Sequence, residues 1–289
     1  MRPVAFDYIR PDSVEEAWQA LADDDDATVL GGGQSLIPVL RFRLAAPTTL
    51  VDLGAIEALK QIREDGEDLV IGAMATHHAV AHDPLVRAHA SVLAQAAASV
   101  ADPQIRYRGT VGGALAHADP AGDIAPAALA LDATVEITGP DGTRTVPARD
   151  FFEDYFTTDL QPGELLSALR VPKHTGWGMH YEKFSPAAQS WAIVAVAAAV
   201  RTEDGTVAEA RLGMANMGAV PLRAPAAEQA LAGRPTHGPA TGEAAARAGE
   251  DTDPPSDLGG TPEYRRHLAG VLAGRAVQTA CGAAGAVEG

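Results

Sequence analysis

Three consecutive glycines interrupt an apolar segment at residues 31–33, within the sequence VLGGGQSLIPVLRFRL (29–44). Glycine loses more backbone entropy on folding than any other residue, so a run of three predicts a tight turn or a close approach to the backbone. The apolar residues before the run predict a strand, and the residues after Ser35 predict a helix that Ser35 caps. Backbone N–H groups at such a junction can cradle an anion. The turn matches neither GxGxxG nor GK[ST], so a plain glycine turn is an equal alternative at this point.

A second glycine turn lies far along the chain, in GTVGGALAHADPAGD (109–123). Thr110 precedes the pair Gly112-Gly113, and its hydroxyl can donate to a phosphate oxygen. The sequence Asp119-Pro120 predicts the start of a helix, and Asp123 can accept a hydrogen bond from a sugar hydroxyl. Two separate glycine turns favour a long ligand held at several points, such as a dinucleotide. A metal site at the two aspartates is the weaker alternative, because no third ligand has suitable spacing, and we predict no metal.

Charge and hydropathy exclude several classes of function. The formal net charge of −16 argues against a nucleic-acid partner, since phosphates would be repelled. The N-terminus lacks the apolar segment of a signal peptide, and the apolar run 191–200 is too short to span a bilayer. We therefore expect a cytoplasmic protein that does not span a membrane. The one cysteine, Cys281, cannot form a disulfide within the chain or hold an iron–sulfur cluster alone, and we expect it to be inert.

The pattern of apolar residues and turn residues predicts a mixture of helices and strands. Strands are predicted at 27–32, 48–54, 68–76, 164–172, 179–184, 193–202 and 206–218, with a hairpin over 134–148. Helices are predicted at 14–21 behind a capping box at Ser13, after Thr76, and at 91–101, 221–232 and 263–280. The last helix should bury Leu268, Val271, Leu272 and Val277 on one side. Residues 233–260 read as a loop, and a domain boundary is expected near 173–177.

At this point the two glycine segments can be compared with known families. GGGQSLIPVLRFRLAAPTTLVDL (31–53) and IRYRGTVGGALAHADPAGD (105–123) resemble the FAD-binding medium subunit of the molybdenum hydroxylases, the xanthine dehydrogenase and carbon monoxide dehydrogenase superfamily. EYRRHLAGVLAGRAV (263–277) is similar to the carbon monoxide dehydrogenase flavoprotein C-terminal domain. The resemblance covers nearly the whole chain, and it is greatest to the carbon monoxide dehydrogenase medium subunits.

The resemblance implies an α+β fold in two domains. Residues 1–175 would form a two-subdomain FAD-binding fold of the PCMH type, with subdomains of about 1–54 and 55–175. Residues 176–289 would form a C-terminal α+β domain with a small antiparallel sheet and helices.

The resemblance also implies noncovalent FAD and a set of residues that bind it. The first loop would wrap the pyrophosphate with the backbone of Leu30, Gly31, Gly32, Gly33, Gln34, Ser35 and Leu36. The remaining positions implied by the family pattern are Thr110, Val111, Gly112, Gly113, Asp123, Leu165 and Lys183.

The chain departs from the family pattern in three places. Gly31 stands where the family usually has alanine, and Ala114 stands where asparagine is common. After Lys183, the residues Pro186, Ala187 and Ser190 replace paired arginines and an aspartate. The last departure bears on contacts with partners and with the electron acceptor.

Several polar residues also have a purely structural interpretation. Lys183 is equally well explained as an edge residue whose ammonium reaches solvent. A surface or structural role is the simpler one for Arg41, Arg43, His77, His78 and His117, while Arg106 and Arg108 are balanced between the two roles.

For function, the resemblance implies an electron-transfer subunit with no catalytic residue of its own. Electrons would arrive from an iron–sulfur small subunit, in a complex with a molybdopterin large subunit, and leave FAD for a quinone, NAD or oxygen. One alternative is a stand-alone FAD-dependent oxidase or dehydrogenase with its own small organic substrate. Another is a dinucleotide-binding scaffold without activity.

Overall fold

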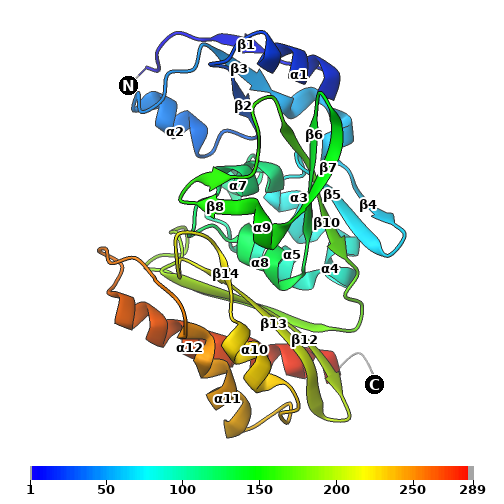
Figure 1. Cartoon of the computed structure of the whole chain (residues 1–289), viewed down its shortest axis with the longest axis vertical. Coiled ribbons are helices and arrows are strands. Elements are labelled where there is room, and N and C mark those ends of the chain that lie inside the picture. The colour runs from blue at the N-terminus through cyan, green and yellow to red at the C-terminus, as the bar shows by residue number, and fades with distance from the viewer. Residues whose placement is uncertain (1, 286–289) are drawn as a thin grey trace.

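The computed structural model describes residues 2–285 and shows an α+β fold, as the resemblance implied. Three sheets of three, five and four strands follow one another along the chain, and a ribbon of two short strands accompanies them. Figure 1 shows the three-stranded sheet at one end of the molecule and the four-stranded sheet towards the other. The predicted C-terminal domain extends to residue 289, so its last four residues lie outside the described part of the chain.

The N-terminal sheet is parallel, with order β1-β3-β2. Parallel strands need crossover connections, and two helices supply them. Helix α1 begins after Ser13, whose hydroxyl accepts the Glu16 amide at 3.1 Å, which confirms the predicted cap. The elements of this part are β1 (Asp7–Ile9), α1 (Val14–Ala22), β2 (Thr28–Leu30), α2 (Leu36–Arg41) and β3 (Thr49–Asp52).

The middle part is an antiparallel sheet of order β4-β5-β10-β6-β7, with helices packed against it. The predicted hairpin over 134–148 is present as β6 and β7. The strands are β4 (Ile62–Asp65), β5 (Asp68–Gly72), β6 (Thr134–Gly139), β7 (Gly142–Pro147) and β10 (Leu165–Pro172), beside the ribbon β8 (Phe152–Asp154) and β9 (Thr157–Thr158). The helices are α3 (His77–His82), α4 (Pro84–His89), α5 (Ser91–Ser99), α6 (Pro103–Arg106), α7 (Val111–His117), α8 (Ile124–Ala130) and α9 (Ala148–Phe151). Short 3-10 turns at η1 (Leu53–Ala55) and η2 (Glu57–Lys60) lead into β4.

The C-terminal part is an antiparallel sheet covered by a long helix. Its strands are β11 (Gly178–Phe184), β12 (Val194–Glu203), β13 (Thr206–Ala215) and β14 (Leu222–Arg223). Its helices are α10 (Pro225–Leu231), α11 (Pro239–Ala245), the 3-10 turn η3 (Ala246–Gly249) and α12 (Pro262–Gly285).

Strand β12 alternates valine and alanine because its two faces meet different neighbours. Val194, Val196 and Val200 pack into the core shared with α12, whereas Ala195 and Ala197 pack into the core of the middle part. Small side chains let helix α8 approach closely: a Cβ added at Gly213 would lie 1.9 Å from the Pro126 carbonyl oxygen. The C-terminal sheet is therefore buried on both faces, between α5 and α8 on one side and α12 on the other (Figure 1).

Two predictions for this part were wrong. Residues 233–260 are not all loop, because α11 and η3 lie within them, in an alanine-rich stretch whose helix begins at Pro239. Val271 is 37% exposed, so the buried side of α12 holds Leu268, Leu272 and Val277 without it. Within the described residues, no helix combines the length and the apolar content that crossing a bilayer requires.

Candidate functional site

The first glycine loop joins β2 to α2 and has a backbone that glycine alone tolerates well. Gly32 and Gly33 have φ angles of +109° and +80°, in the region that L-residues rarely adopt. A Cβ on Gly32 would lie 2.2 Å from the carbonyl oxygen of Arg108. The glycines therefore serve both backbone conformation and close packing against the second loop.

The same loop presents unpaired donors. The amides of Gly32, Gly33, Gln34 and Ser35 donate to no acceptor among residues 2–285, while the Gln34 side chain donates to the Gly32 carbonyl at 3.1 Å. Ser35 does not cap α2 with its hydroxyl, contrary to the prediction. Its φ and ψ of −97° and −45° are helical, whereas a capping side chain requires extended backbone. Four consecutive free N–H groups without a capping side chain fit the diphosphate of a dinucleotide.

The second glycine loop is locked onto the first by Thr110, at the start of α7. The Thr110 hydroxyl donates to the Gly31 carbonyl at 2.6 Å and accepts the Gly113 amide at 3.1 Å. A Cβ at Gly113 would lie 2.6 Å from the same Gly31 carbonyl oxygen. The structure thus brings together two predicted segments that are distant in sequence.

The amides of the second loop have a different role from those of the first. Val111 donates to the Ala75 carbonyl at 3.0 Å, and Gly112 donates to the Ala73 carbonyl at 2.8 Å. A Cβ at Gly112 would lie 2.5 Å from the Cβ of Ala73. These two residues hold the start of α7 against the segment that follows β5. Their amides already donate to carbonyl groups of the protein.

Asp123 and Lys183 form a buried ion pair with Tyr181. Lys183 Nζ lies 2.9 Å from Asp123 Oδ2, and the Tyr181 hydroxyl donates to Asp123 Oδ1 at 2.7 Å. The side chains of Asp123 and Lys183 are 3% and 9% exposed, so Lys183 does not extend to solvent. Burial raises the pKa of Asp123, and the Lys183 ammonium opposes that rise. Burial also holds the pKa of Tyr181 well above its usual value, so its hydroxyl stays a donor.

Asp119 does not start a helix, which corrects the prediction from Asp119-Pro120. Its carboxylate accepts the Ala121 amide at 2.9 Å in a local turn, and α8 begins only at Ile124. Asp123 occupies the capping position of α8, yet its side chain makes no cap bond because Tyr181 and Lys183 engage it.

The remaining predicted site residues lie at the ends of the elements that flank the first loop, or in the apolar core near them. Leu30 ends β2 and Leu36 begins α2, and both are partly buried. Leu165 is buried in a small apolar core with Val51 and Met74.

His77 packs against the second glycine loop at Gly109, a role that the sequence did not reveal. Its amide donates to the Gly109 carbonyl at 2.9 Å, and a Cβ on Gly109 would lie 2.9 Å from the imidazole ring. The ring is 4% exposed, and its Nδ1 has no hydrogen-bond partner among the described residues. Burial lowers the pKa of His77 to about 4, so the ring is neutral near pH 7.

Most of the other polar residues in question have structural roles. His78 stacks on Tyr107 with ring centroids 3.9 Å apart, and His117 lies 5.3 Å from the Phe156 ring. Arg106 donates to the carbonyls of Val100 and Ala101. Arg41 and Arg43 are exposed.

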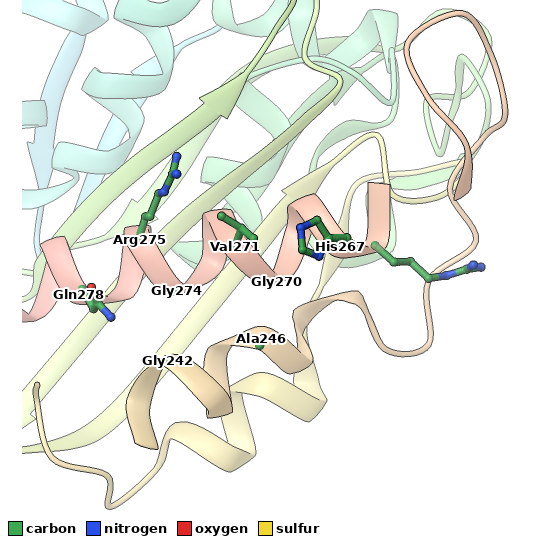
Figure 2. Close-up of a pocket in the computed structure, with 9 residues that line it drawn as sticks. Gly242, Ala246, His267, Gly270, Val271, Gly274, Arg275 and Gln278 are labelled. Atoms are coloured by element: carbon green, nitrogen blue, oxygen red, sulfur yellow. The ribbon is translucent and has the colours of Figure 1, made fainter. Parts of the chain in front are cut away.

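An open groove of about 400 Å³ lies elsewhere, between α11 and α12 (Figure 2). Small residues form much of its wall, among them Gly242, Ala246, Gly270 and Gly274. Gly270 is there for packing, since a Cβ would lie 2.8 Å from the Ala246 carbonyl oxygen. The groove belongs to the C-terminal part and includes none of the predicted site residues.

Comparison with known proteins agrees with this geometry. The family described as "FAD binding domain in molybdopterin dehydrogenase" matches residues 4–174, and "CO dehydrogenase flavoprotein C-terminal domain" matches residues 179–280. The carbon monoxide dehydrogenase medium chain of Afipia carboxidovorans is 42% identical, over 97% of this chain and 98% of that protein.

Solved structures match over the same span. Carbon monoxide dehydrogenase from Oligotropha carboxidovorans superposes with a TM-score of 0.94 at 41% identity, covering 98% of this chain and 100% of that one. Quinoline 2-oxidoreductase from Pseudomonas putida 86 gives 0.93 at 34% identity, covering 98% and 99%. This chain belongs to the FAD-binding medium subunits of the molybdenum hydroxylases, and it is an oxidoreductase subunit whose cofactor is FAD.

Proposed function

We propose that this chain passes electrons through FAD, from iron–sulfur clusters of a partner chain to an external acceptor. The observation that carries the proposal is the first glycine loop, which keeps four amides free while Thr110 holds it against the second loop. The single cysteine cannot ligate an iron–sulfur cluster by itself, so we assign the clusters that reduce the flavin to another chain. Relatives of this chain, such as the carbon monoxide dehydrogenase medium chain, are named as subunits of larger complexes.

The residues of this chain have distinct parts in binding the cofactor. We assign the diphosphate to the amides of the first loop, from Gly32 to Ser35, with Leu30, Gly31 and Leu36 forming its ends. Thr110 and Gly113 hold the first loop in place. Val111 and Gly112 hold the start of α7 through their backbone hydrogen bonds. Leu165 supports the fold beneath the N-terminal sheet.

Asp123 and Lys183 are assigned to the flavin-binding region on the family pattern. Their ion pair is buried, so a ligand hydroxyl at Asp123 would share the carboxylate with Tyr181 and Lys183. Bound FAD supplies the redox chemistry, by accepting and releasing electrons. The protein binds and orients it noncovalently.

The proposed complex has three kinds of chain. This chain is the medium subunit, with a domain division between residues 175 and 176 that agrees with the two family matches. An iron–sulfur small subunit delivers electrons, and a molybdopterin large subunit oxidises the organic or gaseous substrate. A quinone, NAD or oxygen receives the electrons from the flavin.

Anaerobic stopped-flow absorbance at the flavin band tests this function. The purified chain is loaded with FAD and mixed with dithionite, which should bleach the flavin. Aldehydes, purines, aromatic heterocycles and carbon monoxide should leave it oxidised until the two partner chains are added. Rapid bleaching by one organic substrate with this chain alone would overturn the proposal in favour of a stand-alone oxidase.

A further inference from the structure

The side chain of Gln95 links helix α5 to the edge of the C-terminal sheet. Its Nε2 donates to the Met179 carbonyl at 3.3 Å, and its Oε1 accepts the Tyr181 amide at 3.0 Å. Strand β11 lies at one end of the sheet order β11-β12-β13-β14, so no further strand within residues 2–285 pairs with these two backbone groups. A single carboxamide, which carries both a donor and an acceptor, takes the place of that strand.

The side chains of β11 alternate between two neighbours. Tyr181 is buried in the core of the middle part, together with residues of α5 and α8. Glu182 faces the other way, since its carboxylate lies 3.9 Å from the guanidinium of Arg275 on α12. Because side chains two residues apart on a strand share a face, Lys183 lies on the same side as Tyr181 and meets Asp123 there.

The spacing of residues along α5 matches their spacing along β11. Ser99 follows Gln95 by four residues, on the same face of the helix, and its carbonyl accepts a 3.3 Å hydrogen bond from Lys183 Nζ. Four residues of helix advance by about 6 Å, and two residues of strand advance by about 7 Å. The contact of Gln95 with Tyr181 and the contact of Ser99 with Lys183 are therefore in register.

The position of β11 along α5 decides whether Asp123 keeps its partners. One strand residue spans about 3.4 Å, which is more than the 2.7 Å that joins the Tyr181 hydroxyl to Asp123 Oδ1. The flexible Lys183 side chain could follow a displacement of that size, but the rigid ring of Tyr181 could not. The two hydrogen bonds of Gln95 oppose such a displacement, because each is made to one specific backbone group.

We propose that Gln95 is a positioning residue for the flavin, which sets where Tyr181 and Lys183 meet Asp123 and so where the carboxylate is held for the cofactor. This inference rests on the proposed function, in which Asp123 and Lys183 belong to the flavin-binding region. Among the described residues, the Gln95 side chain forms its hydrogen bonds with the backbone of β11, so its effect on FAD passes through that strand.

Titration of the purified full-length chain with FAD, followed by flavin fluorescence, tests the inference. Gln95→Met keeps the length of the side chain and removes both hydrogen bonds, so the Kd for FAD should rise by about five- to ten-fold. The visible circular dichroism of the bound flavin should also change, because the groups around it have moved. Gln278→Met is the matched control, since Gln278 is exposed on α12, and it should leave both measurements unchanged. If Gln95→Met does not fold, Gln95→Glu at pH 8 gives the same comparison, because an ionised carboxylate keeps the acceptor and lacks the donor.

A second background shows whether Gln95 acts through the ion pair. In the double variant Asp123→Asn with Lys183→Met the pair is absent, so adding Gln95→Met should change the Kd for FAD by no more than about two-fold. An equal loss of affinity in both backgrounds would make Gln95 an ordinary structural residue and overturn the inference.

The outcomes separate failure of this inference from failure of the proposed function. If the wild-type chain binds no FAD, the proposed function fails and this inference with it. If removal of the ion pair changes neither the affinity nor the circular dichroism of the flavin, the pair does not belong to the flavin-binding region, and the positioning role is wrong as well. If removal of the pair weakens FAD binding but Gln95→Met matches its control, the function stands and the positioning role alone is wrong.

Discussion

The Thr110 hydroxyl donates a 2.6 Å hydrogen bond to the carbonyl oxygen of Gly31, and this one contact joins the two glycine loops. The Thr110 hydroxyl oxygen also accepts the Gly113 amide at 3.1 Å, so one side chain satisfies a group in each loop. The Thr110 hydroxyl therefore supplies the hydrogen bonds that link the first loop to α7, beside the close backbone packing of the two loops.

Thr110→Ala should weaken FAD binding and destabilise the fold. Loss of the hydroxyl leaves the Gly31 carbonyl and the Gly113 amide without this partner, at a cost of about 1–3 kcal/mol. Thr110→Ser is the control, because it keeps the hydroxyl. Quenching of flavin fluorescence during titration measures the affinity, and equal affinity in the alanine and serine variants would contradict the proposed locking of the loops.

Gly32→Ala should give a folded protein that purifies without flavin. The new Cβ would meet the Arg108 carbonyl at 2.2 Å, in a backbone of φ +109° that alanine disfavours. Gly66→Ala is the matched control, since Gly66 has φ +61° with nothing within 4 Å of its Cβ. The control should lose about 1–2 kcal/mol of stability and keep its FAD. Gly33→Val tests the neighbouring position, where the Cβ would lie 2.9 Å from Ile37.

Lys183→Met should be strongly destabilising, by about 3–5 kcal/mol, because it leaves the buried Asp123 without its counter-ion. Burial raises the pKa of Asp123 in the folded state above its value in the unfolded chain, so stability declines as pH rises from the unfolded-state pKa towards the folded-state one. Removing the Lys183 charge raises the pKa of Asp123 further and extends the decline to higher pH. Urea unfolding at pH 5 and pH 8 measures it, and the double variant with Asp123→Asn should recover much of the loss. A purely additive double-mutant cycle would show that the two groups are not coupled.

The stability of the wild-type chain should fall as pH drops from 6.5 towards 4. The pKa of His77 is lowered to about 4 in the folded state, so the unfolded chain takes up its proton first. This difference contributes at most about 3 kcal/mol. His77→Leu should remove that part of the pH dependence, and His237→Leu, at an exposed position, is the control for the substitution itself. Chemical unfolding across this pH range provides the measurement, and parallel curves for wild type and His77→Leu would refute the assignment.

The sequence predicts the glycine loops well because their requirement is local. A positive φ or a close backbone contact excludes a side chain, and that constraint is visible in the residues themselves at Gly32 and Gly33. Their meeting with Thr110 is a tertiary contact, which no local pattern encodes. The two loops therefore looked equivalent in the sequence, although the amides of Val111, Gly112 and Gly113 in the second loop already donate to the protein.

The wrong predictions arose where packing or distant contacts outweighed a local sequence pattern. Asp119 precedes proline and matches a helix-start pattern, but the helix begins at Ile124, where packing against the C-terminal sheet places it. Helix α11 was missed because flanking Gly and Pro residues outweighed its short alanine-rich core. The partner of Lys183 could not be read from its strand, since Asp123 belongs to a different part of the chain.

The ion pair between Asp123 and Lys183 has a consequence for recombination between related chains. The two family matches end at residue 174 and begin at 179, which makes this stretch an obvious point for exchanging one half with that of a relative. Asp123 lies before that point, whereas Tyr181 and Lys183 lie after it. A chimera joined there inherits a buried carboxylate from one parent and must find a hydroxyl and an ammonium in the other. Exchange of this half is therefore restricted to parents that supply both groups, however well their surfaces match.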